Sequence, residues 1–235
     1  MNQLTVKIQG REARVLVRDS VDQSVAAEIF NWREYRAAEE VISRAKDPII
    51  DVGSHVGLFV IYCRLFNKSV PIYALEPEKN NAEMLRRNID LNKLDNVFVR
   101  EAALAKTSGR GRLWLFPDNH NHRLAELSEE KPPPNAPLQP VKILSLFDLC
   151  LEHKIKRISL LKMDIEGGER ELLAAWGESE FSLLKAIILE YHNRRKDDHK
   201  KLERILRRAG FGVVVFPSRF DKKMGFIFAV NKRNK

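Results

Sequence analysis

The segment that most constrains this chain is PIIDVGSHVGLF, residues 48–59. An apolar run ends in Asp51, a turn containing Gly53 and Gly57 follows, and a second apolar run, residues 58–66, has the length and pattern of a helix. This order of strand, tight turn and helix opens a nucleotide-binding βαβ unit. Glycines let the backbone approach a ligand closely, and the helix start offers free N–H groups. The segment therefore predicts a ligand site at the turn.

The glycine spacing narrows the choice of ligand. A dinucleotide fingerprint reads G-x-G-x-x-G, whereas this turn reads D-x-G-x-x-x-G, with His55 in place of the middle glycine and Leu58 in place of the third. A pyrophosphate lacks the glycine that permits its close approach, so an NAD-dependent oxidoreductase is the least favoured reading. A ligand without phosphates fits better, and S-adenosylmethionine (SAM) is the common one. The alternative is a plain strand-to-helix turn whose glycines serve geometry only.

Length and composition fit one α/β domain with a sizeable core. The chain has 235 residues, of which 44% are hydrophobic and 31% charged, and nothing suggests disorder over its whole length. No apolar stretch approaches the ~20 residues of a membrane span. Residues 1–17 lack the apolar core of a signal peptide. Cys63 and Cys150 are the only cysteines, so we expect no disulfide framework and a cytoplasmic location.

The net charge of +9 is concentrated at the C-terminus. Residues 191–235 carry 14 Lys/Arg and 4 Asp/Glu, so the other residues sum to −1. A basic face over residues 194–208 would attract nucleic acid, acidic lipid or a phosphorylated substrate. The favoured reading is a solvated helix face, because apolar residues recur at helical spacing on its other side and no aromatic residues are interleaved for base stacking.

Strand and helix patterns alternate along most of the chain. A hairpin is predicted around residues 10–12 and a helix over residues 22–45. Strands are predicted at 48–52, 70–76, 96–102, 111–116, 157–165, 185–192, 212–216 and 225–230, and helices at 57–67, 78–92, 145–153, 168–176 and 197–209. This alternation predicts a mainly parallel sheet with helices on both faces.

Two connections depart from the alternation. No helix separates the last two strands, so we expect them to be antiparallel neighbours. Residues 117–140 contain three consecutive prolines and many polar residues, which predicts a loop or a short lid within the domain. The predicted organisation is a hairpin-and-helix extension, residues 1–46, followed by one domain, residues 47–235.

Acidic residues follow the first three predicted strands of the domain, at the edge where open α/β sheets bind ligands. Asp51 ends the first. Glu76 ends the second, 19 residues after Gly57, where an acid binds ribose hydroxyls. The alternative for Glu76 is a surface acid that caps the next helix. Glu101 and Ala102 end the third; the carboxylate is a possible acceptor for an adenine amine, and the small alanine would admit the ring.

The fourth and fifth strands of the predicted site end in further charged residues. Lys162, Asp164, Glu166 and Glu169 lie together in LLKMDIEGGE, more charges than a strand end needs, although Glu169 suits a helix N-terminus. His192, after Glu190, is a possible general base, or else a structural histidine. A Mg²⁺ ion held by Asp164 and Glu190 is the less favoured alternative to a metal-free site.

These motifs together resemble the FkbM family of SAM-dependent methyltransferases. The run K-x-D-x-E-G-x-E is the most specific of them, and the similarity covers about residues 47–192. The segments that carry it are IIDVGSHVGLF (49–59), ALEPEKNN (74–81), NVFVREAAL (96–104), LLKMDIEGGE (160–169) and IILEYH (187–192).

The resemblance implies a Rossmann-like class I methyltransferase sheet of seven strands with the last one antiparallel, SAM as methyl donor, and usually a hydroxyl as acceptor. It implies that Glu76 binds the ribose and that Asp164 lies near the methyl-bearing end, with Glu166 close by. Two positions depart from the family: His55 stands where Asn is frequent, and Phe147 stands where Asp is usual, which puts a role for Asp148 in doubt. By position, the cofactor residues are Asp51, Gly53, Ser54, His55, Gly57, Glu76, Glu101, Ala102 and Asp164.

The predicted activity is O-methylation of a small or sugar-containing molecule. Catalysis would consist mostly of alignment, because the methyl group of a sulfonium is already activated. Asp164, Glu166 or His192 would handle the proton or the acceptor. The alternatives are an RNA methyltransferase that uses the basic C-terminal face, and a non-catalytic SAM-binding protein.

Overall fold

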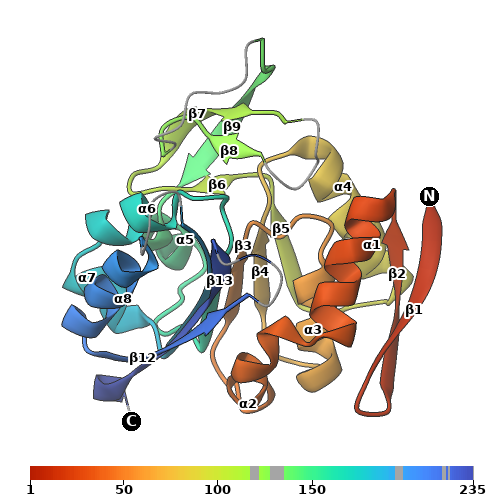
Figure 1. The fold of residues 1–235 in the computed structure, drawn as a ribbon, viewed down its shortest axis with the longest axis horizontal. Helices are drawn as coiled ribbons and strands as arrows, with labels where there is room; N and C mark the ends of the chain where they lie inside the picture. The colour runs from red at the N-terminus through yellow and green to blue at the C-terminus, as the bar shows by residue number, and fades with distance from the viewer. Residues whose placement is uncertain (117–121, 128–134, 194–197, 219–220, 222, 235) are drawn as a thin grey trace.

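A seven-stranded sheet forms the centre of the protein (Figure 1). The computed structural model describes all residues except 117–121, 128–134, 194–197, 219–220, 222 and 235. Strand β13 runs opposite to the other six strands of this sheet, so the predicted sheet and its antiparallel last strand are confirmed. The strand order is β12 (Phe211–Pro217), β13 (Met224–Asn231), β11 (Ala186–His192), β10 (Leu160–Met163), β3 (Ile49–Val52), β4 (Ile72–Leu75) and β5 (Val97–Arg100).

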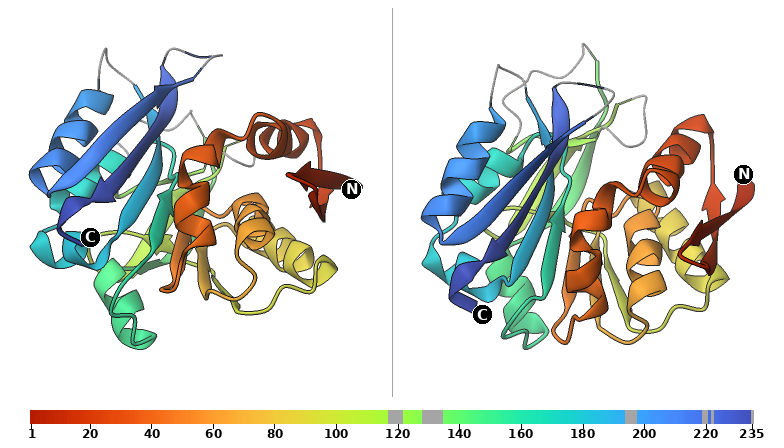
Figure 2. Two further views of the ribbon diagram at one scale, coloured as in Figure 1. Left: turned by 90° about the horizontal axis from the view of Figure 1, so that it is seen from below. Right: turned by 60° about the horizontal axis from the view of Figure 1, so that its bottom comes forward.

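Helices cover both faces of this sheet, as Figure 2 shows. Every residue of β3, β4 and β10 is buried, which is typical of parallel strands packed on two sides. Alternate side chains enter two different core clusters: Ile49 packs with the helices of one face and Ile50 with those of the other. The first face carries α2 (Glu39–Ser43), α3 (Leu58–Phe66) and α4 (Lys79–Leu91); the second carries α5 (Leu146–Glu152), α6 (Glu169–Ala175), α7 (Glu178–Leu183) and α8 (His199–Arg208).

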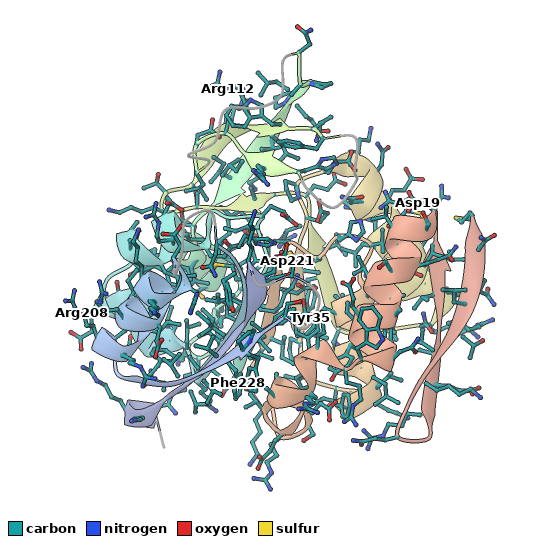
Figure 3. The ribbon with its side chains drawn as sticks, viewed as in Figure 1. Asp19, Tyr35, Arg112, Arg208, Asp221 and Phe228 are labelled. Atoms are coloured by element: carbon teal, nitrogen blue, oxygen red, sulfur yellow. The ribbon has the colours of Figure 1, made fainter. Side chains whose placement is uncertain are left out.

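The N-terminal extension begins with the predicted hairpin, β1 (Asn2–Ile8) and β2 (Arg11–Val17). The single helix predicted over residues 22–45 is wrong. The chain instead forms α1 (Ser20–Ala26), a π-helix η1 (Ala27–Asn31), a 3₁₀-helix η2 (Glu34–Ala38) and α2, with a break at Arg33, whose φ is +54°. Asp19 caps α1 by accepting hydrogen bonds from two backbone amides (Figure 3). Val15 and Val17 of the hairpin pack in the same core cluster as α3.

A smaller four-stranded sheet lies above the carboxyl ends of the parallel strands (Figure 1). The strand predicted at residues 111–116 belongs to it, because β7 pairs with β9 and not with the central sheet. The predicted loop at 117–140 is only partly correct: residues 117–121 and 128–134 lie outside the described residues, but β8 and the start of β9 fall within it. The small sheet consists of β6 (Ala103–Leu104), β9 (Leu138–Leu144), β7 (Gly109–Trp114) and β8 (Arg123–Leu124).

Two simpler expectations also have structural answers. Cys63 and Cys150 are both buried free thiols. In the described part of the chain, no helix has the length and apolar composition needed to cross a membrane.

Candidate active site

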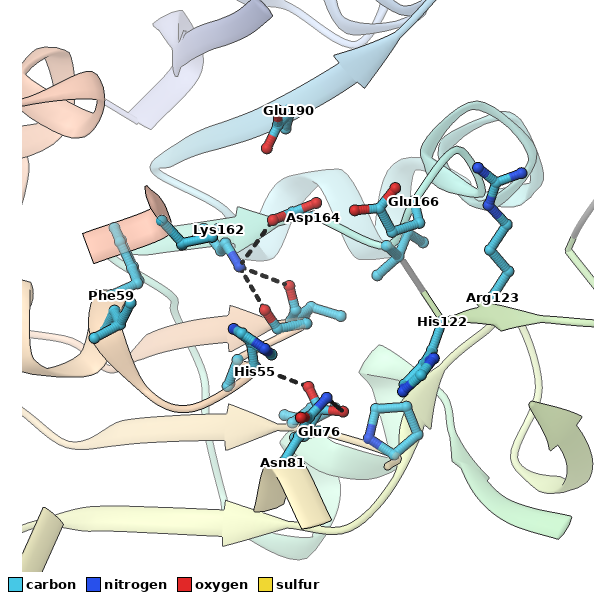
Figure 4. A pocket seen from close by; sticks show the side chains of 18 of the residues that line it. His55, Phe59, Glu76, Asn81, His122, Arg123, Lys162, Asp164, Glu166 and Glu190 are labelled. Atoms are coloured by element: carbon cyan, nitrogen blue, oxygen red, sulfur yellow. Dashed lines mark hydrogen bonds and ion pairs between the residues drawn. The ribbon is translucent and has the colours of Figure 1, made fainter. Parts of the chain in front are cut away.

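A cavity of about 590 Å³ opens at the carboxyl ends of β3, β4, β10 and β11, a volume within the usual range of small-molecule sites. Residues of the N-terminal extension and of the small sheet form its remaining walls. In Figure 4, Glu76 and Asn81 lie at one end of the cavity, Glu190 lies at the other, and Lys162 and Asp164 lie between them. The cavity therefore brings together predicted acids from three strand ends, namely Glu76, Asp164 and Glu190.

The turn after β3 requires glycine at position 53, because a side chain would not fit there. Its φ is +75°, and a Cβ atom there would come within 1.8 Å of the backbone oxygen of Asp164. Gly57 has a φ of +86°, and its Cβ would meet Leu85 Cδ1 at 2.3 Å. The turn amides are used within the protein: Gly53 and Ser54 donate to Leu75 O at 3.0 Å. Gly53 is therefore required by close packing against the backbone as well as by its own conformation, whereas Gly57 is required by its conformation.

Lys162 lies behind this turn as a buried counter-charge. Parallel pairing of β3 and β10 places it beside Asp51, with Nζ 3.2 Å from Asp51 Oδ1 and 3.7 Å from Asp164 Oδ2. Nζ also donates to the backbone oxygen of Gly53 at 2.6 Å. Burial opposes the charge, but attraction to Asp51 and Asp164 outweighs it and raises the pKa of Lys162. Asp51 is fully buried and does not line the cavity, so its contact is with Lys162.

Glu76 presents a buried carboxylate, 5% exposed, at the end of β4. Its Oε2 accepts from His55 N at 2.7 Å, and its Oε1 accepts from Glu78 N at 2.9 Å and from Asn81 Nδ2 at 3.5 Å. Burial raises its pKa to about 7, against these hydrogen bonds, which favour the ionised form. The cap of α4 is Glu78, not Glu76. Glu76 is therefore left to face the cavity.

The wall after β5 is apolar. Ala102 and Ala103 line the cavity next to Glu76, and their small side chains leave room for a flat ring. Glu101, predicted to contact adenine, is not brought into the cavity. Its carboxylate is 45% exposed and pairs with Arg86 at 2.7 Å. Asp148 also lies away from the cavity, where it accepts a hydrogen bond from Ser145 Oγ at 2.8 Å.

The opposite end of the cavity carries a group of acids, which we call the acidic end: Asp164, Glu166, Glu190 and, from η2, Glu34. His192 Nε2 lies 3.7 Å from Glu166 Oε2 and 3.9 Å from Glu190 Oε1. Burial, followed by repulsion from neighbouring acids, raises the pKa of Glu166 and of Glu190 well above the usual range, and that of Glu34 to about 7. Asp164, Glu166 and His192 are thus together, as predicted.

Two polar atoms of this end have no hydrogen-bond partner among the described residues. They are Asp164 Oδ1 and His192 Nδ1, both inaccessible to solvent. Buried polar atoms are normally hydrogen-bonded, so unpaired ones at a cavity need explanation by a ligand or a function. In the described part of the chain, no group of three or more His, Cys, Asp and Glu residues is arranged to hold a metal ion.

Comparison with known proteins decides the family. Residues 51–213, more than half of the chain, match the Methyltransferase FkbM domain. The protein belongs to the FkbM methyltransferase family. Methyltransferase 1 of Beauveria bassiana is 25% identical over 186 residues, 71% of this chain and 73% of its own. The 31-O-demethyl-FK506 methyltransferase FkbM of Streptomyces tacrolimicus is 23% identical over 196 residues, 73% and 75% of the two chains.

Solved structures with the same fold include methyltransferases that contain SAM. Fibrillarin of Aeropyrum pernix, with natively bound SAM, aligns with a TM-score of 0.54 at 14% identity, covering 97% of this chain and 82% of its own. Magnesium protoporphyrin IX methyltransferase of Synechocystis, with bound SAM, gives 0.52 at 12% identity, covering 92% and 86%. This FkbM methyltransferase is therefore a SAM-dependent enzyme of the class I fold, and its predicted family, fold and cofactor are confirmed.

Several functional residues escaped the sequence reasoning. Lys162 was visible only as one charge among several, and its signal was a cation inside an apolar strand with an acid inside the neighbouring one. Glu34 and Asn81 had no signal, because the fold alone brings them to the cavity from the extension and from α4.

Proposed function

We propose that this FkbM methyltransferase transfers the methyl group of SAM to a hydroxyl of a small or sugar-containing molecule. The observation that carries the proposal is the acidic end, where Asp164 Oδ1 has no donor and His192 lies near two carboxylates. A hydroxyl must lose its proton as its oxygen attacks, and these groups are suited to accept it. The relative named 31-O-demethyl-FK506 methyltransferase supports an oxygen acceptor.

The other end of the cavity suits the nucleoside of SAM. The Glu76 carboxylate would accept from the ribose hydroxyls, and Ala102 and Ala103 would flank the adenine. Gly53 and Ser54 would lie against the amino-acid part, with Asp164 near the sulfonium. When bound, SAM supplies a methyl group already activated on sulfur. The protein then has to align the acceptor with that methyl group and exclude water.

Proton removal is assigned to the acidic end. The Asp164 side chain lines the cavity and is 25% exposed, so its carboxylate would accept a hydrogen bond from the attacking hydroxyl, with Glu166 and His192 beside it. Several carboxylates in one wall would also bind the neighbouring hydroxyls of a sugar-like acceptor. General bases of this kind contribute roughly 10²–10⁴-fold to a rate.

The test is incubation of the protein with methyl-labelled SAM and fractionated cell extract, followed by identification of the labelled product. An acid-stable methyl ether would support the proposal, and a methylated nitrogen, carbon or carboxylate would contradict it. Asp164→Asn, Glu166→Gln and His192→Asn are then compared with Glu101→Gln, a matched carboxylate outside the cavity. Full turnover in all three site variants would refute the catalytic assignment.

The RNA-methyltransferase alternative depends on the basic face. Residues 194–197 of that face lie outside the described residues. In the described remainder, Lys201 pairs with Asp198 at 2.9 Å and Arg207 with Glu203 at 2.7 Å. Figure 3 places Arg208 at the outer edge of the molecule and Tyr35, a cavity residue, near its middle. Nucleic-acid binding stays a prediction, which the salt dependence of RNA affinity would test.

A further inference from the structure

Arg18 of the N-terminal extension contacts both Asn81 of α4 and His55 of the turn after β3, at the end of the cavity where Glu76 lies. Its NH1 donates to Asn81 Oδ1 at 2.7 Å, and its NH2 contacts His55 Nε2 at 2.9 Å. The guanidinium is held in this position by Asp22, which accepts from Nε at 2.9 Å and from NH2 at 3.0 Å. Asp22 is fully buried. Arg18 lies before the first residue of the match to the FkbM domain, residue 51.

Both contacts continue to Glu76. The Arg18 side chain has only donors, so it fixes the Asn81 amide with its oxygen toward Arg18 and its Nδ2 toward Glu76 Oε1, 3.5 Å away. His55 donates its backbone N–H to Glu76 Oε2 at 2.7 Å. The backbone of His55 is in the left-handed region, with φ +50°, which a residue with a side chain adopts at a cost. A side-chain contact with Arg18 stabilises that conformation.

We propose that Arg18 is a positioning residue for the cofactor, which aligns two of the three donors to the Glu76 carboxylate so that the carboxylate faces the ribose hydroxyls. The inference rests on the proposed ribose role of Glu76. Glu76 has three donors, from His55, Glu78 and Asn81, and Arg18 controls two of them. Arg18, which does not line the cavity, would thus contribute to SAM affinity without touching SAM.

A purely structural role makes a different prediction. If Arg18 only holds the extension in place, its loss would weaken every ligand of the cavity to the same extent. If it orients Glu76, its loss would weaken only ligands that carry ribose hydroxyls. S-adenosylhomocysteine and its 2′,3′-dideoxy analogue differ in those hydroxyls alone, so the pair separates the two roles.

The experiment measures binding of both ligands by calorimetry to the full chain. Arg18→Lys keeps the ion pair with Asp22 but has one nitrogen in place of the three that Arg18 uses, so it cannot reproduce all four contacts. It is expected to bind S-adenosylhomocysteine roughly tenfold more weakly, since hydrogen bonds to a charged group are lost. Its affinity for the dideoxy analogue stays at the wild-type value. Arg18→Ala leaves buried Asp22 unpaired, so Arg18→Lys decides if that variant does not fold.

Arg14→Ala is the matched control. Arg14 lies in the same extension and donates to Leu91 O at 3.0 Å, so it connects the hairpin to α4 without reaching Glu76. It should bind both ligands as the wild type does. Equal weakening of both ligands by Arg18→Lys, or no weakening of either, would overturn the inference. Glu76→Gln separates the two assumptions: if it does not discriminate between the ligands, the ribose role fails, and if it does while Arg18→Lys does not, only the role of Arg18 fails.

Discussion

Replacing Gly53 with alanine tests whether the turn after β3 must touch the chain that leaves β10. The added Cβ would lie 1.8 Å from the backbone oxygen of Asp164, an atom that cannot rotate away as a side chain would. Gly10 offers a matched control, because its φ of +77° is close to the +75° of Gly53 and nothing lies within 4 Å of the position of its Cβ. The two substitutions therefore share the backbone cost and differ in the contact.

The expected magnitudes follow from these two terms. A residue with a side chain in the left-handed region costs about 1–2 kcal/mol, which is the whole expected effect of Gly10→Ala. Insertion of a methyl group into a packed site costs about 1–3 kcal/mol more. Gly53→Ala should therefore lower the free energy of unfolding by about 2–5 kcal/mol, and it should also weaken SAM binding because the turn has to move.

Urea denaturation gives the free energy of unfolding of each variant, and calorimetry gives the affinity for S-adenosylhomocysteine. Gly10→Ala should leave the affinity unchanged. If Gly53→Ala costs no more stability than Gly10→Ala and binds the ligand equally well, the close approach of the turn to Asp164 is refuted as a requirement of the fold.

Three further predictions concern the charges of the cavity. Lys162→Met should lower the free energy of unfolding, measured by urea denaturation, by about 3–5 kcal/mol, because it leaves buried Asp51 without its cation. Adding Asp51→Asn to the same chain should recover most of the loss, and equal stability of the single and double variants would contradict this. Burial raises the pKa of Glu76 to about 7 in the free protein. Because ribose hydroxyls favour the ionised carboxylate, binding of S-adenosylhomocysteine near pH 7 should release protons. Calorimetry in two buffers of different ionisation enthalpy measures the released protons, and proton uptake would count against the ribose role of Glu76. Burial raises the pKa of Glu34 to about 7 from an ordinary value near 4.5. The folded state therefore binds more protons than the unfolded state, and stability is lost as the pH rises between these two pKa values. Glu34→Gln should raise the melting temperature at pH 8 and not at pH 4, and an equal shift at both would exclude the raised pKa of Glu34 as the cause.

The central sheet was predictable because its strands are buried on both faces. Apolar runs such as residues 48–52 and 157–165 are typical of parallel strands that are covered by helices on both faces. A right-handed crossover through each helix then fixes the order of neighbouring parallel strands. The break at Arg33 was not predictable, because no proline or glycine marks it. Arg33 adopts a left-handed conformation there, and its guanidinium pairs with Glu39, which also accepts from Tyr62 of α3.

The candidate site was predictable where an acidic residue directly follows an apolar strand in the sequence. Glu76 and Asp164 each follow an apolar run directly, so the topology places them at one edge. Glu101 follows such a run too, but its side chain turns to Arg86 on the surface, a choice set by local packing. Arg18 is 37 residues from His55 and 63 from Asn81. Contacts of that range depend on the fold and leave no pattern in a single sequence.

The most direct test of this account is a crystal structure of the protein with S-adenosylhomocysteine. We expect the ribose hydroxyls to lie within hydrogen-bond distance of the Glu76 carboxylate, the adenine to lie against Ala102 and Ala103, and the sulfur to face Asp164. A ligand bound elsewhere, or in the same cavity with its ribose away from Glu76, would contradict it.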